Sequence, residues 1–469
     1  MTGSRRTSFL AVALTVLLSA STSSRADDAG LETEVRKRAS AVEEKVIKWR
    51  RDIHEHPELA DQETRTSHLV AEHLRSLGLE VRTGVARTGV IGVLQGGKPG
   101  RSMALRADMD ALPVKEPEGL PFASKARQPY LGKEVDVMHA CGHDAHTAML
   151  MGVAEVLAGI KDQLPGTVLF IFQPAEEGPS LFTPASGKTW GAKLMLEEGA
   201  FKDPKPDAVF GLHVMPGPLG QISYRTGATA ASSDDLEIIV TGRQGHGGMP
   251  WNTIDPVTTS ALVITGLQTV VSRRANLTAS PAVVTIGTIN GGTRANIVPD
   301  KVAMAGTIRT YDEKVRAQLG DDVKLTAQKI AESAGAKAEV RITPMYATTV
   351  NDAALAAAMA PALKRAADGN VAESPLAGAS EDFSFYAQAV PGLYVFLGVT
   401  PKDQDPAKAA PNHNPKFFVD EHALVIGVRT MATLAVDFLT SPPLSKETEQ
   451  SPRTFVHESA CTIGSPRSS

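Results

Sequence analysis

The chain has few cysteines and few aromatic side chains, and these shortages exclude several classes of protein. Of 469 residues, 2 are Cys and 5% are aromatic. A single possible cysteine pair cannot form a disulfide framework. With 48 Lys+Arg against 52 Asp+Glu, the chain also lacks the basic excess of a protein that binds nucleic acid through bulk charge. Because 42% of the residues are hydrophobic, the composition indicates a soluble globular protein.

Uninterrupted apolar runs long enough to cross a bilayer are also missing from the sequence. The run Phe9–Ala20 is too short, but it follows Arg5 and Arg6 and precedes a small-residue stretch that ends at Ala26. This order of charged, apolar and small residues is typical of a secretory signal. We therefore expect residues 1–26 to direct export, to the periplasm or outside the cell, and to be removed. The twin-arginine and general secretory routes both stay open.

The C-terminal end lacks the periodic apolar positions of a packed element. Residues 441–469 are rich in Ser, Pro, Thr and Glu, which predicts a flexible tail. Cys461 lies there and is interpreted as an incidental thiol.

Between these ends, short apolar strands alternate with amphipathic helices. The alternation predicts an α/β fold, a layered domain around a mainly parallel sheet, built from residues 27–222 plus 344–440. Polar side chains follow three of the strands, at Asp108, Glu176 and His213, and ligands bind at the carboxyl ends of such strands. The expected strands are 103–106, 166–172 and 208–213, and the expected helices are 39–54, 64–77 and 147–157.

A second unit occupies residues 223–343. Its pattern is strand, helix, strand, then an Asn-Gly-Gly turn at 290–292, and again strand, helix, strand. This β-α-β-β-α-β order predicts a ferredoxin-like α+β domain inserted into the larger one.

One segment concentrates metal-ligating side chains. His139, Cys141, His143 and His146 lie close together, and a thiol with neutral imidazoles is a favourable ligand set for Zn²⁺. For His146 and its neighbour Asp144, a role at the start of a helix stays open.

A pair of glutamates follows the second apolar strand, in the segment 173–178. Neighbouring side chains of an extended chain face opposite ways, so one carboxylate could bind metal while the other faces the substrate. Hydrolysis assisted by a metal needs that division, because a free carboxylate must take a proton from water. His213 at a strand end and His413 between two prolines are further candidate ligands.

Two rival motifs fail. Gly92–Lys98 has the spacing of a phosphate-binding loop, but Pro99 stands where a hydroxyl residue is required. Ser380 lacks the second glycine of a nucleophile elbow, which argues against a serine hydrolase.

The chain resembles the M20 metallopeptidase family, in particular its amidohydrolase branch of hippurate hydrolases, N-acyl-amino-acid deacylases and auxin-conjugate hydrolases. The matching stretches occur in family order and cover nearly all of the chain between residues 45 and 430. They are 50–59, 105–113, 139–146, 173–178, 211–213, 245–256, 296–300, 380–383 and 413–417.

The resemblance implies a catalytic site with two divalent metal ions, of which Zn²⁺ is favoured by the cysteine while Mn²⁺, Co²⁺ and Ni²⁺ stay open. It implies that Glu176 is the general base and that Asp108 orients a ligand without binding metal itself. The implied ligands are Cys141 as the bridging thiolate, His143, Glu177, His213 and His413.

The resemblance also implies roles for the smaller domain, as a lid and dimerisation domain of a homodimer. His246 would reach the active site of the partner and stabilise the oxyanion, and Asn296 and Arg309 would hold the α-carboxylate of the substrate.

The expected reaction is hydrolysis of N-acyl amino acids. An exopeptidase (carboxypeptidase or dipeptidase) and a non-catalytic metal- or solute-binding exported protein are the alternatives. The loop Ser180–Gly191, with Phe182 and Trp190, is expected to shape the acyl pocket.

Overall fold

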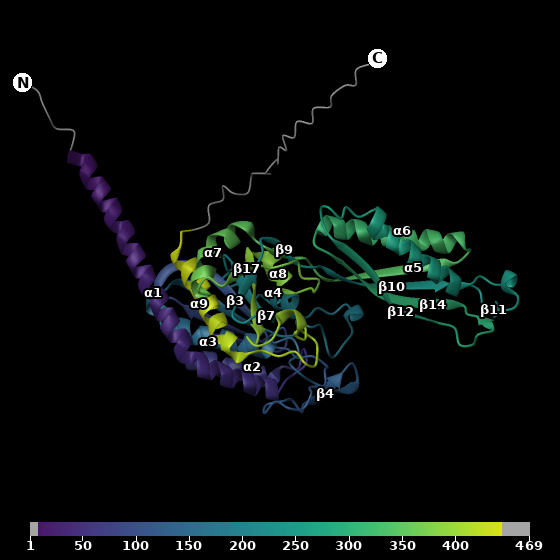
Figure 1. Ribbon diagram of the computed structural model, residues 1–469, viewed down its shortest axis with the longest axis horizontal. Helices are drawn as coiled ribbons and strands as arrows, with labels where there is room; N and C mark the ends of the chain where they lie inside the picture. The colour runs from purple at the N-terminus through teal and green to yellow at the C-terminus, as the bar shows by residue number, and fades with distance from the viewer. Residues whose placement is uncertain (1–7, 443–469) are drawn as a thin grey trace, which may run out of the picture.

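The computed structural model describes residues 8–442, and for residues 8–29 and 185 it describes the backbone alone. The start of the expected signal and the expected tail from residue 443 onward, including Cys461, lie outside the described residues. Two sheets dominate the described part, a large one in the main body and a small one in a lobe that projects from it (Figure 1).

The large sheet has eight strands in the order β1-β2-β6-β3-β7-β18-β8-β17. Its four central strands, β6, β3, β7 and β18, run parallel, and antiparallel pairs occur toward the edges, so the sheet is mixed and mostly parallel. Every residue of Gly392–Thr400 is buried, as expected for a strand covered on both faces. The strands are β1 (Glu80–Val85), β2 (Gly89–Gln95), β3 (Lys98–Asp108), β6 (Pro165–Gln173), β7 (Val209–Pro218), β8 (Ile222–Tyr224), β17 (Val371–Glu373) and β18 (Gly392–Thr400).

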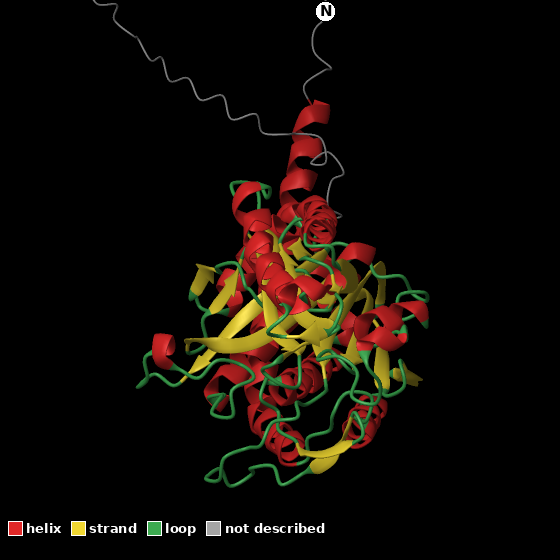
Figure 2. Cartoon of the chain, turned by 90° about the vertical axis from the view of Figure 1, so that its right-hand side faces the viewer, coloured by secondary structure: helices red, strands yellow, loops and turns green. Residues whose placement is uncertain are grey.

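Helices cover both faces of this sheet, which gives the layered α/β architecture expected from the sequence (Figure 2). One hydrophobic core joins the sheet to five helices, and a second core joins its other face to two shorter ones. The first group is α1 (Ser8–Glu55), α2 (Thr64–Ser76), α3 (His143–Ala158), α7 (Ala353–Ala366) and α9 (Leu424–Thr440), and the second is α4 (Gly191–Glu197) and α8 (Phe383–Ala389).

The small sheet has four antiparallel strands in the order β12-β14-β10-β15. This is the strand order of a ferredoxin-like unit, and α5 and α6 pack on one of its faces through a separate hydrophobic core. Asp255 and Asp312 start these two helices by accepting hydrogen bonds from backbone N–H groups of the first turn. The elements are β10 (Ser233–Thr241), α5 (Pro256–Arg273), β12 (Ala282–Gly291), β14 (Lys301–Thr310), α6 (Glu313–Ser333) and β15 (Lys337–Tyr346).

Three two-stranded sheets complete the fold. They are β4 (Arg127–Tyr130) with β5 (Lys133–Asp136), β9 (Gly227–Ala230) with β16 (Thr349–Asn351), and β11 (Gly245–His246) with β13 (Ile297–Val298). The second of these lies where the chain passes between the main body and the lobe, before β10 and after β15.

One segment of the described chain, Glu421–Thr440, is long and apolar enough to cross a membrane, with a mean hydropathy of 1.6. Most of its residues are buried inside the protein, because α9 packs against α1, α3 and the large sheet. Packing in the core therefore accounts for its composition.

Candidate functional site

Parallel strands bring the candidate residues to one edge of the large sheet. β3 ends at Asp108, β6 ends at Gln173 just before the glutamate pair, and β7 carries His213. Because β3 lies between β6 and β7 and Arg106 pairs with Gly211, the ends of β3 and β6 lie beside His213, which is inside β7 and not at its end as the sequence predicted. The segment 139–146, which leads into α3, completes the edge, because Thr147 donates a hydrogen bond to the carbonyl of Asp108.

The structure brings all five predicted ligand residues together. The Sγ of Cys141 lies 3.4 Å from Nε2 of His213. The Nε2 of His143 lies 3.9 Å from Oε1 of Glu177, and Nε2 of His413 lies 3.1 Å from that same oxygen. Their ligand atoms form overlapping groups within 4.8 Å that share Cys141. Three imidazoles, a thiol and a carboxylate at this separation can hold a metal ion.

Backbone carbonyls fix the orientation of two of the imidazoles. Nδ1 of His143 donates to the carbonyl of Asp110 at 2.8 Å, and Nδ1 of His213 donates to the carbonyl of Val214 at 2.7 Å. In the neutral rings each Nε2 then carries a lone pair, and the buried Nε2 of His143 has no hydrogen-bond partner. This is the usual arrangement of a metal-binding histidine.

His413 reaches the site on a loop that is tied to the cysteine segment. Asn412 donates through Nδ2 to the carbonyls of Cys141 (2.9 Å) and Val214 (3.1 Å), and the N–H of His413 donates to the carbonyl of Ala140. His413 itself has a φ of +68°, in the left-handed region. These bonds hold a strained residue in place and so fix the direction of its imidazole.

The glutamate pair does not diverge as the sequence predicted. Oε2 of Glu176 and Oε1 of Glu177 lie 4.0 and 3.9 Å from the same atom, Nε2 of His143. The chain is not extended here, because Ala175 has a φ of +54° and both glutamates lie in a turn. A turn lets neighbouring side chains converge, whereas the prediction assumed the alternation of a strand.

The pKa values of these two carboxyl groups are shifted in opposite directions. Burial, followed by the charges of Glu381 and Glu177, raises the pKa of Glu176 well above the usual range. Burial would also raise the pKa of Glu177, but contact with His413 and the charge of His143 outweigh it and lower that pKa. Glu176 is therefore the stronger base of the two, and Glu177 is the one more readily held as an anion.

The site as a whole carries an excess of acidic groups. Burial, with the charges of Glu177 and Glu176, raises the pKa of the Cys141 thiol. Burial would lower the pKa of His143, but Asp108 and nearby carboxylates outweigh it and raise this pKa to about 10. A bound cation would stabilise the charged forms of these buried acids. The donor set and the unpartnered Nε2 of His143 thus fit divalent metal ions.

Asp108 does not orient one of the five ligands directly. Its Oδ1 lies 2.6 Å from Nδ1 of His146, its Oδ2 accepts from Arg106, and Nε2 of His143 is 3.7 Å away. His146 in turn accepts at Nε2 from the N–H of Val214, next to His213. The influence of Asp108 on the ligands therefore passes through His146.

Asp110 makes the contacts that the sequence reasoning assigned to Asp108. Besides its carbonyl bond to His143, its carboxylate accepts from the N–H groups of Glu176 (3.0 Å) and Glu177 (2.9 Å). No signal in the sequence separates the two aspartates, because both follow the same strand and are two residues apart.

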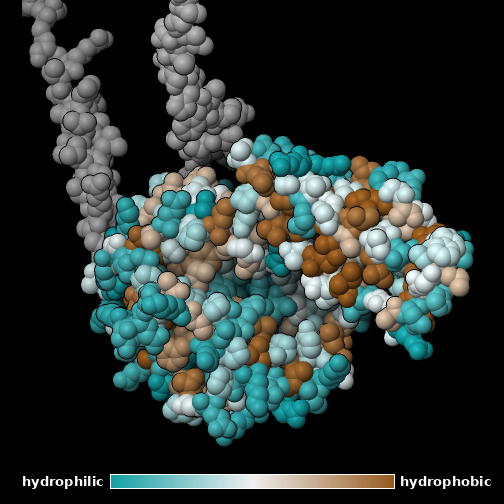
Figure 3. All heavy atoms as spheres, turned by 45° about the vertical axis from the view of Figure 1, so that its right-hand side comes forward, coloured by the Kyte–Doolittle hydropathy of each residue, from teal (hydrophilic) through white to brown (hydrophobic). Residues whose placement is uncertain are grey.

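A cleft of about 600 Å³ opens beside these residues, between the main body and the lobe. The molecular surface is visibly hollowed there (Figure 3). Arg309 of β14 lines the cleft together with Cys141, Glu176 and Glu177, and its Nη1 donates to Oγ of Ser380 at 2.8 Å. One cation of the lobe thus faces the same space as the candidate metal centre.

His246 and Asn296 do not line this cleft. Both are exposed, and they lie at the paired strands β11 and β13, where the N–H of Gly247 donates to the carbonyl of Asn296. Figure 1 shows β11 at the outer end of the lobe, away from the large sheet. Within one chain, therefore, Asn296 does not stand beside Arg309.

The loop Ser180–Gly191 also contributes no lining residue to the cleft. Phe182 packs near Trp190 and under the cations of Arg87 and Lys188. The indole Nε1 of Trp190 donates to the hydroxyl of Tyr346, which does line the cleft. The expectation that this loop forms the acyl pocket is therefore not supported by its position.

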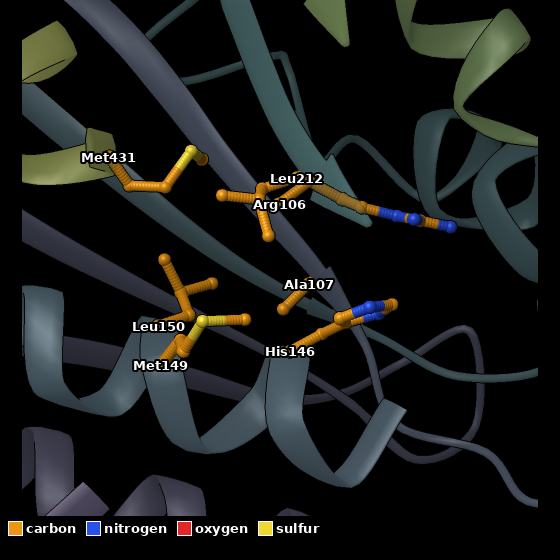
Figure 4. A pocket seen from close by; sticks show the side chains of 7 residues that line it. All are labelled: Arg106, Ala107, His146, Met149, Leu150, Leu212 and Met431. Carbon is orange, nitrogen blue, oxygen red and sulfur yellow. The ribbon is translucent and has the colours of Figure 1, made fainter. Parts of the chain in front are cut away.

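Beneath the site, a small cavity of about 10 Å³ lies between the sheet and α3 (Figure 4). The guanidinium of Arg106 and the imidazole of His146 point to one side of it, and Met149 and Leu150 of α3 and Met431 of α9 lie toward the other side. A space of this size holds at most about one water molecule. Solvent and substrate therefore reach the metal centre from the cleft.

Comparisons with known proteins agree with this geometry. Residues 104–437 match the sequence profile of peptidase family M20/M25/M40. The chain is 42% identical to thermostable carboxypeptidase 1 of Saccharolobus solfataricus over 400 residues, covering 85% of this chain and 96% of the relative. It is 37% identical to the N-acetylcysteine deacetylase of Bacillus subtilis over 399 residues, covering 84% and 97%.

One solved structure is similar to this chain along the whole length of that structure. It is the YXEP protein of Bacillus subtilis, described as a dinuclear metal-binding peptidase of the M20 family. The TM-score is 0.70 at 34% identity, and the match covers 86% of this chain and all of the other.

Proposed function

The chain belongs to peptidase family M20/M25/M40, as a metal-dependent hydrolase of amide bonds, and from this membership we propose that it hydrolyses N-acyl amino acids to a carboxylic acid and a free amino acid. One observation carries the proposal. A buried carboxyl group with a raised pKa, Glu176, lies beside a cluster of metal-ligating side chains and in the same cleft as Arg309.

The proposed reaction divides the chemistry between metal and protein. Cys141, His143, Glu177, His213 and His413 would hold the metal, which when bound polarises a carbonyl group and acidifies water. Glu176 takes the proton from the attacking water and then delivers it to the departing nitrogen. An amine leaves poorly without that proton, so Glu176 acts twice in each turnover.

Arg309 supports a substrate with a free α-carboxylate. Its guanidinium faces the cleft and keeps its charge, and it can bind a carboxylate through two parallel hydrogen bonds. The acyl group would contact the apolar part of the lining, which includes Met215, Met345 and Phe396.

An exopeptidase activity is the second candidate, because the chain is 42% identical to a carboxypeptidase. The third possibility, a binding protein without turnover, is disfavoured, because binding alone needs no free base such as Glu176. The deciding experiment compares hippurate, N-acetyl amino acids and dipeptides with metal-loaded protein. N-acyl amino acids should give the highest kcat/KM, and a preference for dipeptides would replace the proposal with the exopeptidase.

Two metal ions per chain are part of the proposal, with Zn²⁺ as the first candidate. Support comes from a cysteine at the centre of two overlapping ligand groups and from the likeness to a dinuclear relative. Mn²⁺, Co²⁺ and Ni²⁺ are the alternatives, and elemental analysis of the purified protein distinguishes them.

We also propose a homodimer formed through the lobe, residues 223–343. Apolar side chains gather on the visible surface of the lobe (Figure 3). Val257 and Leu262 of α5 are exposed, and so are Val283 and Ile289 of β12, an edge strand that pairs on one side only, with β14. Edge strands and exposed apolar surface favour association. In such a dimer His246 of one chain would act at the site of the other, where it would stabilise the oxyanion.

Export is the last part of the proposal. Its support is the order of Arg5, Arg6, the apolar run Phe9–Ala20 and the small residues up to Ala26. N-terminal sequencing of protein from the native host should begin near residue 27. Protein that retains residue 1 inside the cell would overturn this part alone.

A further inference from the structure

The loop that carries the proposed base is held by side chains rather than by backbone pairing. We call residues 174–178 the Glu176 loop. Its turn passes through Ala175, whose φ of +54° is uncommon for a residue with a Cβ. The N–H groups of three successive residues, 175–177, all donate to carboxylates of other segments.

Asp110 receives two of these hydrogen bonds. Its Oδ1 accepts from Glu176 at 3.0 Å and its Oδ2 accepts from Glu177 at 2.9 Å. Asp110 is 1% exposed, so water does not compete for the same oxygens.

Glu63 receives the third. Its Oε1 accepts from the N–H of Ala175 at 2.8 Å, and its Oε2 accepts from Oγ1 of Thr88 at 2.6 Å. Glu63 is 0% exposed and stands just before α2. The Glu176 loop is therefore held by hydrogen bonds to two separate segments of the chain, one after β3 and one before α2.

We propose that Glu63 is a positioning residue for catalysis, which fixes the Ala175 peptide and thereby the place of the Glu176 carboxylate. Glu63 does not line the cleft, and the hydrogen bonds of its side chain among the described residues go to Thr88 and Ala175 and to none of the five ligand residues. It acts through the backbone of the Glu176 loop. The inference rests on the proposed function in that turnover is one of its readouts.

The reach of the Glu63 side chain matters more than its charge. Burial, and then the charge of Asp110, raises the pKa of Glu63 well above the usual range, so a neutral amide is a close mimic. Gln at this position keeps an acceptor oxygen for Ala175 and can donate to Thr88. Asp keeps the carboxyl group but is one methylene too short to reach the same N–H.

The test compares three substitutions of Glu63 in the metal-loaded protein. Glu63→Gln should keep kcat within about twofold, because the hydrogen bond to Ala175 remains. Glu63→Asp and Glu63→Leu should lower kcat by about 10–100-fold, since partners that orient catalytic groups have effects of this size. KM and the number of bound metal ions should stay within about twofold in all three.

Glu58 provides a matched control. It is also a buried carboxylate, 8% exposed, and its oxygens accept from the N–H groups of Arg65 and Thr66 at 2.8 Å. These bonds belong to α2 and do not touch the Glu176 loop. Glu58→Leu should therefore lower the melting temperature while kcat stays within about twofold.

Amide hydrogen exchange of the peptide 173–178 gives a readout that needs no turnover. Exchange there should be faster in Glu63→Asp and Glu63→Leu, and unchanged in Glu63→Gln and Glu58→Leu. If the wild-type protein hydrolysed no amide, the proposed function would fail. Hydrogen exchange would still test whether Glu63 holds the Glu176 loop in place.

Two results would overturn the proposal. One is Glu63→Gln losing as much kcat as Glu63→Asp, because that would assign the effect to charge. The other is exchange of 173–178 and kcat both remaining at wild-type values in Glu63→Asp. Should Glu63→Leu not fold, the comparison of Gln with Asp still decides.

Discussion

At the scale of single residues, Arg309 is the side chain through which the lobe contributes a charge to the cleft. Its replacement by Ala should raise KM for an N-acyl amino acid by about 10–100-fold, the equivalent of one charged hydrogen-bond pair, with a smaller change in kcat. For the same substrate with its α-carboxylate converted to an amide, Arg309→Ala should leave KM almost unchanged relative to wild type. Steady-state kinetics on this substrate pair is the measurement.

Arg341 is the control for that experiment. It lies on β15 of the same sheet, with 68% of its side chain exposed, and it is not part of the cleft lining. Arg341→Ala should leave both substrates unaffected. Equal losses on the acid and the amide in Arg309→Ala would show that the guanidinium supports the fold rather than the carboxylate.

The types of the ligand residues could be predicted from the sequence, but their supports could not. Cys141 and His143 stand out because thiols and imidazoles cluster there. Asp110 is hidden by its neighbour Asp108, since nothing in the sequence shows which of two aspartates at one strand end faces the loop. Glu63 bonds to the backbone of a distant residue, and such a contact leaves no pattern in the chain.

At the scale of elements, a buried ion pair joins α1 to α3. Nε of Arg50 donates to Oδ2 of Asp144 at 2.7 Å, and Nδ1 of His54 lies 2.8 Å from the same oxygen. Asp144→Asn should lower the free energy of unfolding by about 3–5 kcal/mol, because the buried Arg50 and His54 lose the carboxylate that they share and Arg50 keeps only its contact with Glu421. Urea unfolding followed by circular dichroism measures the loss.

Asp52 on α1 provides the comparison, since its ion pair with Arg65 is exposed. Asp52→Asn should cost less than about 1 kcal/mol. Similar losses for the two variants would contradict the account of the buried pair.

The contribution of Asp144 to the free energy of unfolding should depend on pH. Burial would raise its pKa, but the charges of Arg50 and His54 outweigh burial and hold it well below the usual range. A depressed carboxyl pKa stabilises the folded state above the unfolded value and loses that effect as pH falls. The difference between wild type and Asp144→Asn should be largest at about pH 5 to 6 and shrink below about pH 4. It should also decline as pH rises above about 6.5, because Asp144 raises the pKa of His54 and this contribution is lost when His54 releases its proton. A difference that grows as pH falls below about 4 would be inconsistent with this.

Elements with strong periodicity could be predicted well, and irregular backbone could not. The strand-helix-strand pattern expected for residues 223–343 forms as β10, α5 and β12, because caps and alternating apolar residues act locally. The sequence did not predict the turn at Ala175. Its left-handed conformation is imposed by distant carboxylates, and the position is not a glycine, the residue that usually indicates such a conformation.

At the scale of the whole molecule, the lobe holds residues that are far from the site of their own chain. If His246 acts in the partner subunit, then His246→Ala and Glu176→Gln are each inactive but complement each other. Mixed dimers formed by refolding the two together contain one intact site. About a quarter of wild-type activity should return in an equal mixture. Mixed dimers that form and stay inactive would contradict the exchange of His246 between subunits.

The relation between the two sheets is the part of the fold that the sequence could not predict. The alternation of strands and helices follows from local pattern, whereas the cleft exists because the lobe is set beside the carboxyl edge of the large sheet. That placement depends on the connections near β9 and β16, which are short and carry no strong pattern.

The central claim is that five ligand residues hold a pair of cations while Glu176 remains free to move a proton. Elemental analysis combined with turnover, on wild type and Glu176→Gln, tests it most directly. Both proteins should carry two divalent ions per chain, and Glu176→Gln should lose about a thousandfold or more in kcat. Wild-type turnover by Glu176→Gln at full metal occupancy, or active wild-type protein without bound metal, would contradict the claim.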